Sequence, residues 1–125
     1  MKKYFLFIVA SAVILLGGVF FFTKNQGNAM PLSTPPPITS YEYFWGDGCP
    51  HCANVEEFMK TWEKKDQTNI QKLEVWSNRE NAQLMQERAK SCGIAPSGMG
   101  VPFLVTPEGK CLSGDTPIIE LFKSL

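Results

Sequence analysis

The sequence predicts a small α/β sandwich in which three helices cover a mixed sheet of four strands. Three observations indicate this architecture. Short β-prone runs alternate with runs that have the 3.6-residue period of an amphipathic helix, in the order β-α-β-α-β-β-α. The first strand-helix-strand unit implies parallel pairing through a right-handed crossover, and the short connection between the last two strands implies an antiparallel hairpin. A long apolar run before the domain predicts a transmembrane helix.

The apolar run covers residues 4–22 and contains no charged side chain. As a helix, its 19 residues would be roughly 28 Å long, close to the hydrocarbon thickness of a bilayer. Lys2 and Lys3 precede it, so residues 1–3 are expected in the cytoplasm and the rest of the chain outside the cell membrane, in the periplasm or extracellular space. The alternative is a signal peptide cleaved near residues 27–29, which would leave a secreted domain. The anchor is favoured because a signal peptide has only about 7 to 15 apolar residues.

Residues 23–39 are rich in Pro, Gly, Ser, Thr and Asn without an apolar period, and they predict an extended tether before a folded domain at 40–125. Beyond the lysines that flank the apolar run, nine Lys and Arg stand against twelve Asp and Glu, a net charge of about −3. Binding to nucleic acid is therefore not expected. The chain has four cysteines, and disulfide chemistry is accessible to them in an exported domain.

The domain is expected to begin with an aromatic strand at residues 41–45 (YEYFW), which ends at the turn residues 46–48. Apolar residues then recur at the i, i+3, i+4, i+7 spacing of one helix face. These residues are Val55, Phe58, Met59 and Trp62. Residues 70–76 (IQKLEVW) predict a second strand, which completes a β-α-β unit.

A second helix is expected after the capping-box sequence Ser77–Glu80 and before Gly93, which can end it. Its spacing of apolar residues predicts one buried stripe. The stripe consists of Ala82, Met85 and Ala89.

The last part of the chain predicts a hairpin and a final helix. Residues 101–106 (VPFLVT) and 110–112 (KCL) are the expected strands of the hairpin. The helix is expected to start with Thr116 as its N-cap and Pro117 at its first position. Its expected buried residues are Ile118, Leu121, Phe122 and Leu125.

Cys49 and Cys52 stand where the first strand gives way to the first helix, in the sequence GDGCPHC. Pro50 occupies the first helical turn, where a missing N–H costs little. Backbone N–H groups and the positive end of the helix dipole favour the thiolate form of Cys49. Cys52 lies one turn further along, in position to attack a mixed disulfide on Cys49. The expected roles are nucleophile for Cys49 and resolving thiol for Cys52.

The tetrapeptide Cys49–Cys52 (CPHC) resembles the active site of the thioredoxin superfamily, and it is similar to that of the DsbA-type periplasmic disulfide oxidases. The resemblance covers residues 40–125. Val101-Pro102 resembles the family's cis-proline opposite the CxxC motif, and Gly114-Asp115 resembles the glycine that thioredoxins and glutaredoxins keep near the site. The chain is too short for the helical insertion of the large oxidases. The resemblance implies a thioredoxin-like domain of glutaredoxin size.

His51 is the only histidine of the chain and lies between the two cysteines. It can donate a hydrogen bond to the Cys49 thiolate or, when protonated, stabilise it electrostatically, and either effect makes the disulfide more oxidising. The alternative is a solvated residue without effect. A cis bond at Pro102 would expose the Val101 backbone for pairing with an extended substrate. The candidates for an apolar substrate-binding rim are Trp45, Met99 and Val101.

Six residues before the first cysteine, the family often has a buried carboxylate that relays protons to the second thiol. Tyr43 occupies that position here, and the nearest acids are Glu42 and Asp47. Alternation along the strand places Glu42 on the opposite face from Tyr43. The sequence therefore assigns no proton acceptor.

Cys92 and Cys111 have three open interpretations: two buried free thiols, a structural disulfide that joins the second helix to the last strand, or a second redox relay. A zinc site made of all four cysteines is disfavoured, because a second CxxC motif is missing and gaps of 39 and 18 residues match no zinc finger or ribbon. No metal is expected, and no cofactor other than the redox-active Cys49–Cys52 pair.

These observations favour a membrane-tethered thiol–disulfide oxidoreductase outside the cytoplasm. Its expected partners are exported protein substrates and a membrane redox partner, and the CPHC sequence favours an oxidase. One alternative is a reductase or isomerase of the same fold, which would receive electrons from a membrane partner. The other is a non-catalytic thioredoxin-fold adaptor in which the cysteines are structural.

Overall fold

The computed structural model describes residues 34–125. The predicted cytoplasmic residues 1–3, the predicted transmembrane segment 4–22 and the alternative cleavage site at 27–29 lie outside the described residues, as does most of the predicted linker. Among the helices of residues 34–125, none has the length and hydrophobicity that a membrane span requires.

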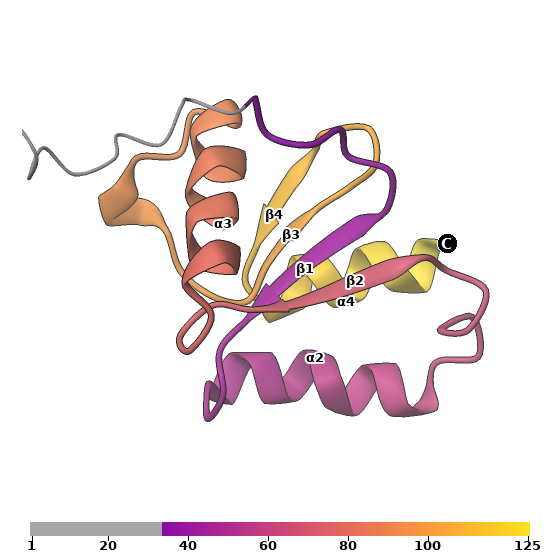
Figure 1. Cartoon of the computed structure of the whole chain (residues 1–125). Helices are drawn as coiled ribbons and strands as arrows, with labels where there is room; N and C mark the ends of the chain where they lie inside the picture. Colours follow the sequence, from indigo (N-terminus) through magenta and orange to yellow (C-terminus); the bar gives the residue numbers. More distant parts are fainter. Residues whose placement is uncertain (1–33) are drawn as a thin grey trace, which may run out of the picture. The chain divides into compact units, whose positions relative to one another are not determined.

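Four strands form one mixed sheet in the order β2-β1-β3-β4 (Figure 1). The strands are β1 (Tyr41–Trp45), β2 (Ile70–Glu74), β3 (Phe103–Val105) and β4 (Cys111–Ser113). β1 pairs in parallel with β2 and antiparallel with β3, and β3 pairs antiparallel with β4. β1 is thus an interior strand, and the CPHC motif follows its carboxyl end.

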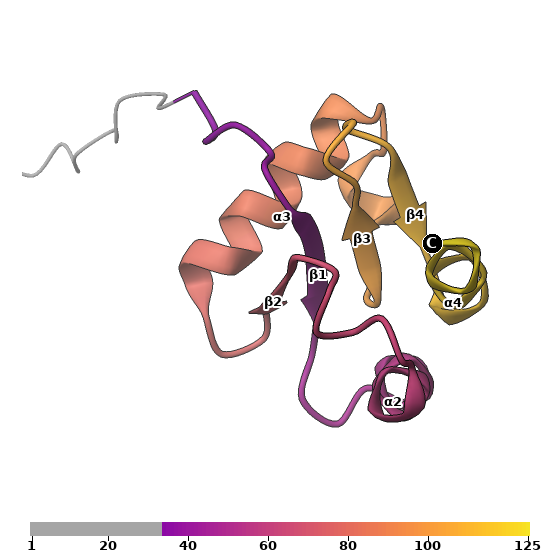
Figure 2. The same ribbon diagram turned by 90° about the vertical axis from the view of Figure 1, so that its right-hand side faces the viewer.

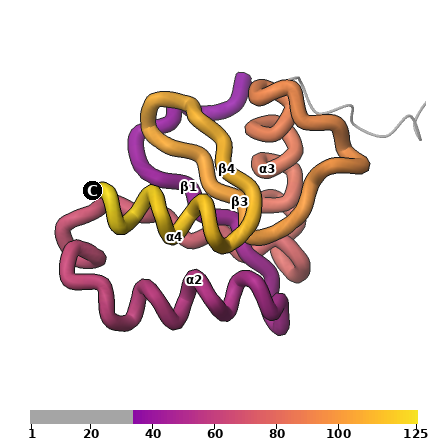
Figure 3. The backbone as a smooth tube through the Cα atoms, turned by 180° about the vertical axis from the view of Figure 1, so that it is seen from behind, coloured from indigo at the N-terminus to yellow at the C-terminus, as the bar shows by residue number. Residues whose placement is uncertain are grey.

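Three α-helices cover the two faces of the sheet. They are α2 (Pro50–Thr61), α3 (Arg79–Ser91) and α4 (Asp115–Ser124), and a short 3-10 helix, η1 (Pro96–Gly98), follows α3. Figure 2 shows α3 on one side of the strands and α2 with α4 on the other, and Figure 3 shows α2 and α4 side by side. The prediction of a mixed four-stranded sheet covered by three helices is confirmed.

The alternation of side chains along β1 divides the core in two. Tyr43 points toward α2 and α4 and is fully buried in the first core cluster with Val55, Leu104 and Phe122. Phe44, the next residue, belongs to a second cluster on the α3 side of the sheet. Because both faces of β1 are buried, its aromatic composition stabilises both layers.

The start of α3 differs from the prediction by one residue. Asn78 is the N-cap, and its side-chain oxygen accepts the Asn81 N–H at 3.1 Å. Ser77 does not cap the helix, because its hydroxyl donates to the Glu74 carboxylate instead. The same carboxylate accepts the N–H groups of Trp76 and Ser77, each at 2.8 Å, which turns the chain away from the sheet. β2 therefore ends at Glu74 and not at Trp76.

The start of α4 also lies earlier than predicted. Gly114 is the N-cap, with a φ of 93° that a residue with a side chain rarely adopts. Thr116 is not the cap, because its N–H already donates to the Asp115 carboxylate at 2.9 Å. Pro117 still falls within the first helical turn, where a missing N–H leaves no bond unmade. Leu125 was expected in the core but is exposed.

A buried ion pair fastens α3 to β1. The Arg88 side chain donates to both carboxylate oxygens of Glu42, at 2.7 and 2.8 Å, and to the Pro36 carbonyl at 2.7 Å. Both side chains of the pair are only 5% exposed. Removing one partner of such a pair leaves an uncompensated buried charge, which is strongly destabilising. Arg88 thus contributes to the inward face of α3, although the apolar pattern did not include it.

We expect Arg88→Met to lower the free energy of unfolding by about 3–5 kcal/mol, because Glu42 would lose its counter-charge in the core. The double variant Glu42→Leu, Arg88→Met should recover most of the loss, since no charge then remains buried. Urea denaturation followed by circular dichroism measures both. Lys90→Met, an exposed change on the same helix, is the control and should shift stability by less than about 0.5 kcal/mol. A double variant no more stable than the single one would contradict the explanation.

Candidate active site

The turn after β1 places Cys49 at the N-terminus of α2. Gly48 adopts a φ of 76°, in the left-handed region, and the Cys49 N–H donates to the Gly46 carbonyl at 3.2 Å, which closes the turn. Cys49 is the N-cap of the helix, and its sulfur accepts the Cys52 N–H at 3.2 Å. Pro50 occupies the first helical position, as the sequence predicts. The Cys49 sulfur therefore receives a backbone donor at the positive end of the helix dipole.

A second segment faces the same sulfur from the other side of the site. The Cys49 thiol lies 3.6 Å from the Val101 carbonyl oxygen, and the Val101–Pro102 peptide bond is cis. The resemblance implied this proline geometry. The Gly114 N–H donates to the Pro102 carbonyl at 2.9 Å, which joins the start of α4 to this segment. Gly114 thus lies near the site, in agreement with the resemblance.

Cys52 is the more enclosed of the two thiols. It is 2% exposed, against 7% for Cys49. Burial raises the pKa of Cys52 to about 12, and its hydrogen bonding with the Cys49 side chain contributes in the same direction. At neutral pH, Cys52 is therefore a protonated thiol that needs a base before it can attack.

Tyr43, six residues before Cys49 on β1, contacts Cys52. Its hydroxyl donates to the Cys52 carbonyl oxygen at 3.4 Å. Burial raises the pKa of Tyr43 well above its usual value, and the nearby Cys52 thiolate raises it further. Tyr43 therefore stays a neutral phenol and cannot take a proton from Cys52.

His51 does not make the predicted hydrogen bond to Cys49 in the part of the chain that the structure describes. Its ring is 71% exposed, and Nδ1 lies 3.2 Å from the Asp115 carboxylate at the start of α4. The Asn54 amide donates to the same carboxylate oxygen. The first turn of α2 turns the His51 ring toward α4, because Asp115 lies within reach and the Cys49 sulfur is already bonded to a backbone N–H. An electrostatic effect of His51 on Cys49 stays a prediction.

Asp115 holds a fixed negative charge beside the site. The Asn54 side chain lowers its pKa most, followed by His51 and the Thr116 N–H, and the pKa falls to about 2. The carboxylate is therefore ionised at all physiological pH values. It bridges the first turns of α2 and α4 and fixes the direction of the His51 ring.

The three residues of the predicted apolar rim do not form one surface. Trp45 packs against the core cluster on the α2 and α4 side and lines a cavity of about 310 Å³ beside Cys49 and Cys52. Met99 and Val101 pack against the other cluster, on the α3 side. Met99 also lines a separate, largely apolar cavity of about 510 Å³ between α3 and η1. Of the three, Val101 is the one in contact with a reactive sulfur.

Trp76 is an aromatic residue near the site that sequence reasoning placed in a strand. It is 61% exposed and lies over Gly46, where an added Cβ would collide with the indole ring. The Glu74 carboxylate holds the Trp76 backbone in place. Glu74, with the turn residues Ser77 and Asn78 three and four positions after it, is a signal that could have ended the predicted strand earlier. Gly46 is thus required by the close approach of Trp76 to the active-site turn.

Cys92 and Cys111 form a disulfide, with their Cα atoms 6.3 Å apart. The predicted disulfide between the two residues is confirmed, and the interpretation as two free thiols is wrong. The interpretation as a second redox relay stays a prediction. Cys92 is the C-cap of α3 and Cys111 begins β4, so the bond joins the helix to an edge of the sheet. The remaining pair, Cys49 and Cys52, are free thiols.

Comparisons of the chain with models of protein families, with curated proteins and with solved structures found no match. The fold and the site by themselves define a class: a small α/β domain with a dithiol at the N-terminus of a helix. One thiol is a helix cap and the other is buried and protonated. Any assignment of function depends on this arrangement.

We expect replacement of both Cys92 and Cys111 by alanine to lower the free energy of unfolding by about 3 kcal/mol, the value for a loop of this length. Urea denaturation under oxidising conditions measures the change. Ser91→Ala, an exposed neighbour, is the matched control and should leave stability nearly unchanged. A loss below about 1 kcal/mol would show that the bond does little to restrain the unfolded chain.

We expect iodoacetamide at pH 7 to modify Cys49 and to leave Cys52 unmodified. Because burial raises the pKa of Cys52 to about 12, its thiol stays protonated at pH 7, and the thiolate fraction rises about tenfold with each pH unit below that pKa. In the Cys49→Ser variant, alkylation of Cys52 should therefore be slow at neutral pH and rise steeply toward pH 10. Mass spectrometry of the digested protein measures both sites. Rapid Cys52 labelling at pH 7 would show that its thiol is not held protonated.

Proposed function

We propose that the domain is a thiol–disulfide oxidoreductase of the thioredoxin superfamily that acts on protein thiols and disulfides. The observation that carries the proposal is the asymmetry of the two sulfurs. Cys49 accepts a backbone N–H at a helix N-terminus and faces the Val101 carbonyl, whereas Cys52 is the more enclosed of the two thiols and burial raises its pKa. Such a difference separates an attacking thiol from a resolving thiol.

In the oxidising direction, a substrate thiolate attacks the Cys49 sulfur of the Cys49–Cys52 disulfide. A mixed disulfide forms between substrate and Cys49, and Cys52 leaves with the electron pair and takes up a proton. A second substrate thiolate then attacks the substrate sulfur of the mixed disulfide and releases the Cys49 thiolate. The substrate has lost two electrons, which a membrane redox partner must later accept from the reduced pair.

Oxidation is the favoured direction. A helix N-terminus stabilises the Cys49 thiolate, which exists only in the reduced form, and a stabilised reduced form makes the disulfide a stronger oxidant. The resemblance of the CPHC tetrapeptide to the DsbA-type oxidases supports the same direction. The predicted membrane anchor at residues 4–22 would hold the domain outside the cytoplasm, where newly exported proteins acquire disulfides.

An extended segment of the substrate would bind beside the cysteines. The Val101 backbone next to the Cys49 sulfur is suited to pair with such a segment by strand addition. The substrate sulfur would then approach Cys49 from the side of Val101 and Pro102. This mode of binding recognises the substrate's backbone rather than its side chains, and it therefore suits an enzyme with many protein substrates.

Two rivals differ from this proposal in direction or in class. A reductase or isomerase would use the same thiols with electrons supplied by a membrane partner, and the reduction potential of the Cys49–Cys52 pair separates it from an oxidase. A non-catalytic adaptor would need structural cysteines. Cys92 and Cys111 fit that role, but Cys49 and Cys52 are free thiols at a helix start, and this favours an enzyme.

The proposal predicts that Cys52→Ser traps substrates and Cys49→Ser does not. Without Cys52, attack by Cys49 continues but the mixed disulfide cannot be resolved, so covalent adducts that dithiothreitol releases should accumulate on non-reducing gels. Cys49→Ser should trap far fewer, because the remaining thiol is buried and protonated. Because the Cys49 thiol must attack an existing disulfide to form such an adduct, an oxidase should trap its membrane oxidant, whereas a reductase or isomerase should trap exported proteins that already contain disulfides. Equal trapping by the two variants would contradict the proposal and favour the non-catalytic adaptor.

A further inference from the structure

The buried thiol of Cys52 raises a chemical question that the proposed function leaves open. To attack a mixed disulfide, Cys52 must lose a proton, and when it leaves as a thiolate it must regain one. Its sulfur is nearly excluded from bulk water, and burial holds its pKa at about 12. A group close to Cys52 must therefore carry this proton if the step is to be fast near neutral pH.

Most titratable groups around the site are unsuited to this task. Tyr43 is held as a neutral phenol by burial. Glu42 lies on the opposite face of β1, where it is buried with Arg88 and away from the cavity that Cys52 lines. His51 faces Asp115 at the exposed start of α4.

Glu56 has the required position. It follows Cys52 by four residues on α2, so the two side chains are neighbours on one face of the helix. Both residues line the cavity of about 310 Å³ beside the active-site turn, which has room for several water molecules. The negative charges of Cys52 and Glu56 both raise the pKa of Tyr43, as expected if all three groups lie close together.

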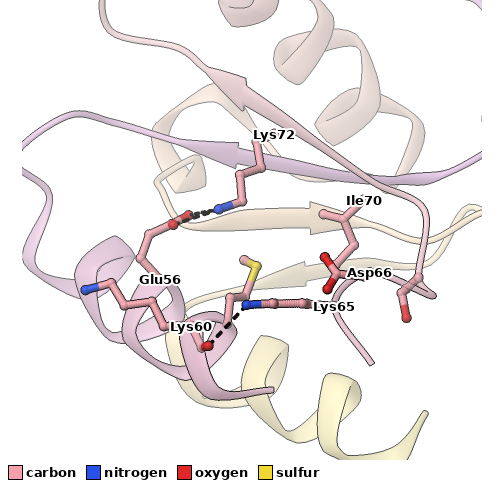
Figure 4. A pocket seen from close by; sticks show the side chains of 8 residues that line it. Glu56, Lys60, Lys65, Asp66, Ile70 and Lys72 are labelled. Atoms are coloured by element: carbon pink, nitrogen blue, oxygen red, sulfur yellow. Dashed lines mark hydrogen bonds and ion pairs between the residues drawn. The ribbon is translucent and has the colours of Figure 1, made fainter. Parts of the chain in front are cut away.

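Lys72 on β2 fixes the Glu56 carboxylate. Its ammonium group donates to the two carboxylate oxygens at 2.7 and 3.0 Å, and Figure 4 shows this pair spanning the gap between the helix and the strand. The side chains are partly exposed, 33% for Glu56 and 46% for Lys72, so the pair stays in contact with solvent. Glu56 therefore lines the thiol cavity and is also in contact with solvent, so its carboxylate can take up a proton and pass it on.

We propose that Glu56, held by Lys72, is the proton acceptor for Cys52. This assignment rests on the proposed function. In resolution, the Cys52 proton passes through cavity water to the Glu56 carboxylate, and the Cys52 thiolate attacks the Cys49 sulfur. The Cys49–Cys52 bond forms, the mixed disulfide breaks, and the substrate sulfur leaves with the electron pair. In the oxidising direction, Glu56 returns the proton to the departing Cys52 thiolate. Lys72 is a positioning residue.

The charged and titratable groups near Glu56 come from each element packed around it. Lys60, on α2, lies one turn beyond Glu56 and carries a pKa that its pair with Glu57 raises most and Glu56 raises further. Lys72 approaches from β2 and Tyr43 from β1. The active-site turn contributes Cys49 and Asp47, which line the same cavity. Tyr43 stays protonated throughout, because burial raises its pKa well above the usual value.

Stopped-flow reaction of the reduced full-length protein with Ellman's reagent separates attack from resolution. Attack by Cys49 releases the first thionitrobenzoate, and attack by Cys52 on the resulting mixed disulfide releases the second. We expect Glu56→Gln to slow the second phase at least tenfold at pH 7 and to leave the first within about twofold. Because hydroxide can remove the proton directly, the difference should shrink as the pH approaches 10.

Three variants complete the experiment. Glu57→Gln removes the adjacent carboxylate, which pairs with Lys60 and does not line the cavity, and it should leave both phases unchanged. Glu56→Asp should restore part of the second phase, which a merely structural role for the side chain would not predict. Lys72→Met should slow the second phase less than Glu56→Gln does, because the carboxylate remains.

Failure of this inference is distinct from failure of the proposed function. If the wild-type protein gives two phases and Glu56→Gln gives the same second phase at pH 7, Glu56 is not the proton acceptor. A slow second phase in Glu56→Gln that stays equally slow at pH 10 would also overturn the assignment. If the wild-type protein gives no second phase, Cys52 does not resolve the mixed disulfide and the oxidoreductase proposal itself fails.

Discussion

The hydrogen bond from the Cys52 N–H to the Cys49 sulfur fixes the geometry on which the rest of the site depends. A helix needs a cap for its first N–H groups, and here the cap is a sulfur atom in place of the usual hydroxyl or carboxylate. The same contact orients the Cys49 sulfur toward the Val101 carbonyl. Secondary structure and reactivity are therefore not separate properties in this part of the chain. The group that starts α2 is also the group that would react.

Different kinds of interaction hold the helices on the two faces of the sheet. On the α3 face, the Glu42–Arg88 ion pair fastens the helix to the interior strand β1, and the Cys92–Cys111 disulfide fastens its end to the edge strand β4. On the other face, α2 and α4 meet the sheet mainly through apolar side chains. The Glu56–Lys72 pair adds a polar contact between α2 and β2, and hydrogen bonds to Asp115 join the N-terminal ends of the two helices. Because a small domain has a limited core, the disulfide and the ion pair that hold α3 on one face allow the other face to contain a buried thiol.

The N-terminus of α4 connects parts of the site that lie far apart in the sequence. Gly114 donates to the carbonyl of Pro102, and Asp115 binds His51 and Asn54 on α2. The proline segment and the CPHC motif are thus held against the same helix end. Asp115 is ionised at all physiological pH values, so its negative charge is present at this helix end throughout that range.

The sequence by itself determined what depends on near neighbours: the bounds of β1, the start of α2 at Pro50, the CPHC dithiol and the order of the elements. Turn residues, helix period and strand alternation act over a few positions, so a linear pattern contains them. Only the tertiary structure decided which distant groups meet. It paired Arg88 with Glu42 across 46 residues, His51 with Asp115 across 64 and Lys72 with Glu56 across 16, and it joined Cys92 to Cys111 in a disulfide. These contacts follow from the order and register of the strands. For example, the parallel pairing of β1 with β2 places Lys72 opposite Tyr43, and Lys72 therefore lies beside α2, the helix that follows β1.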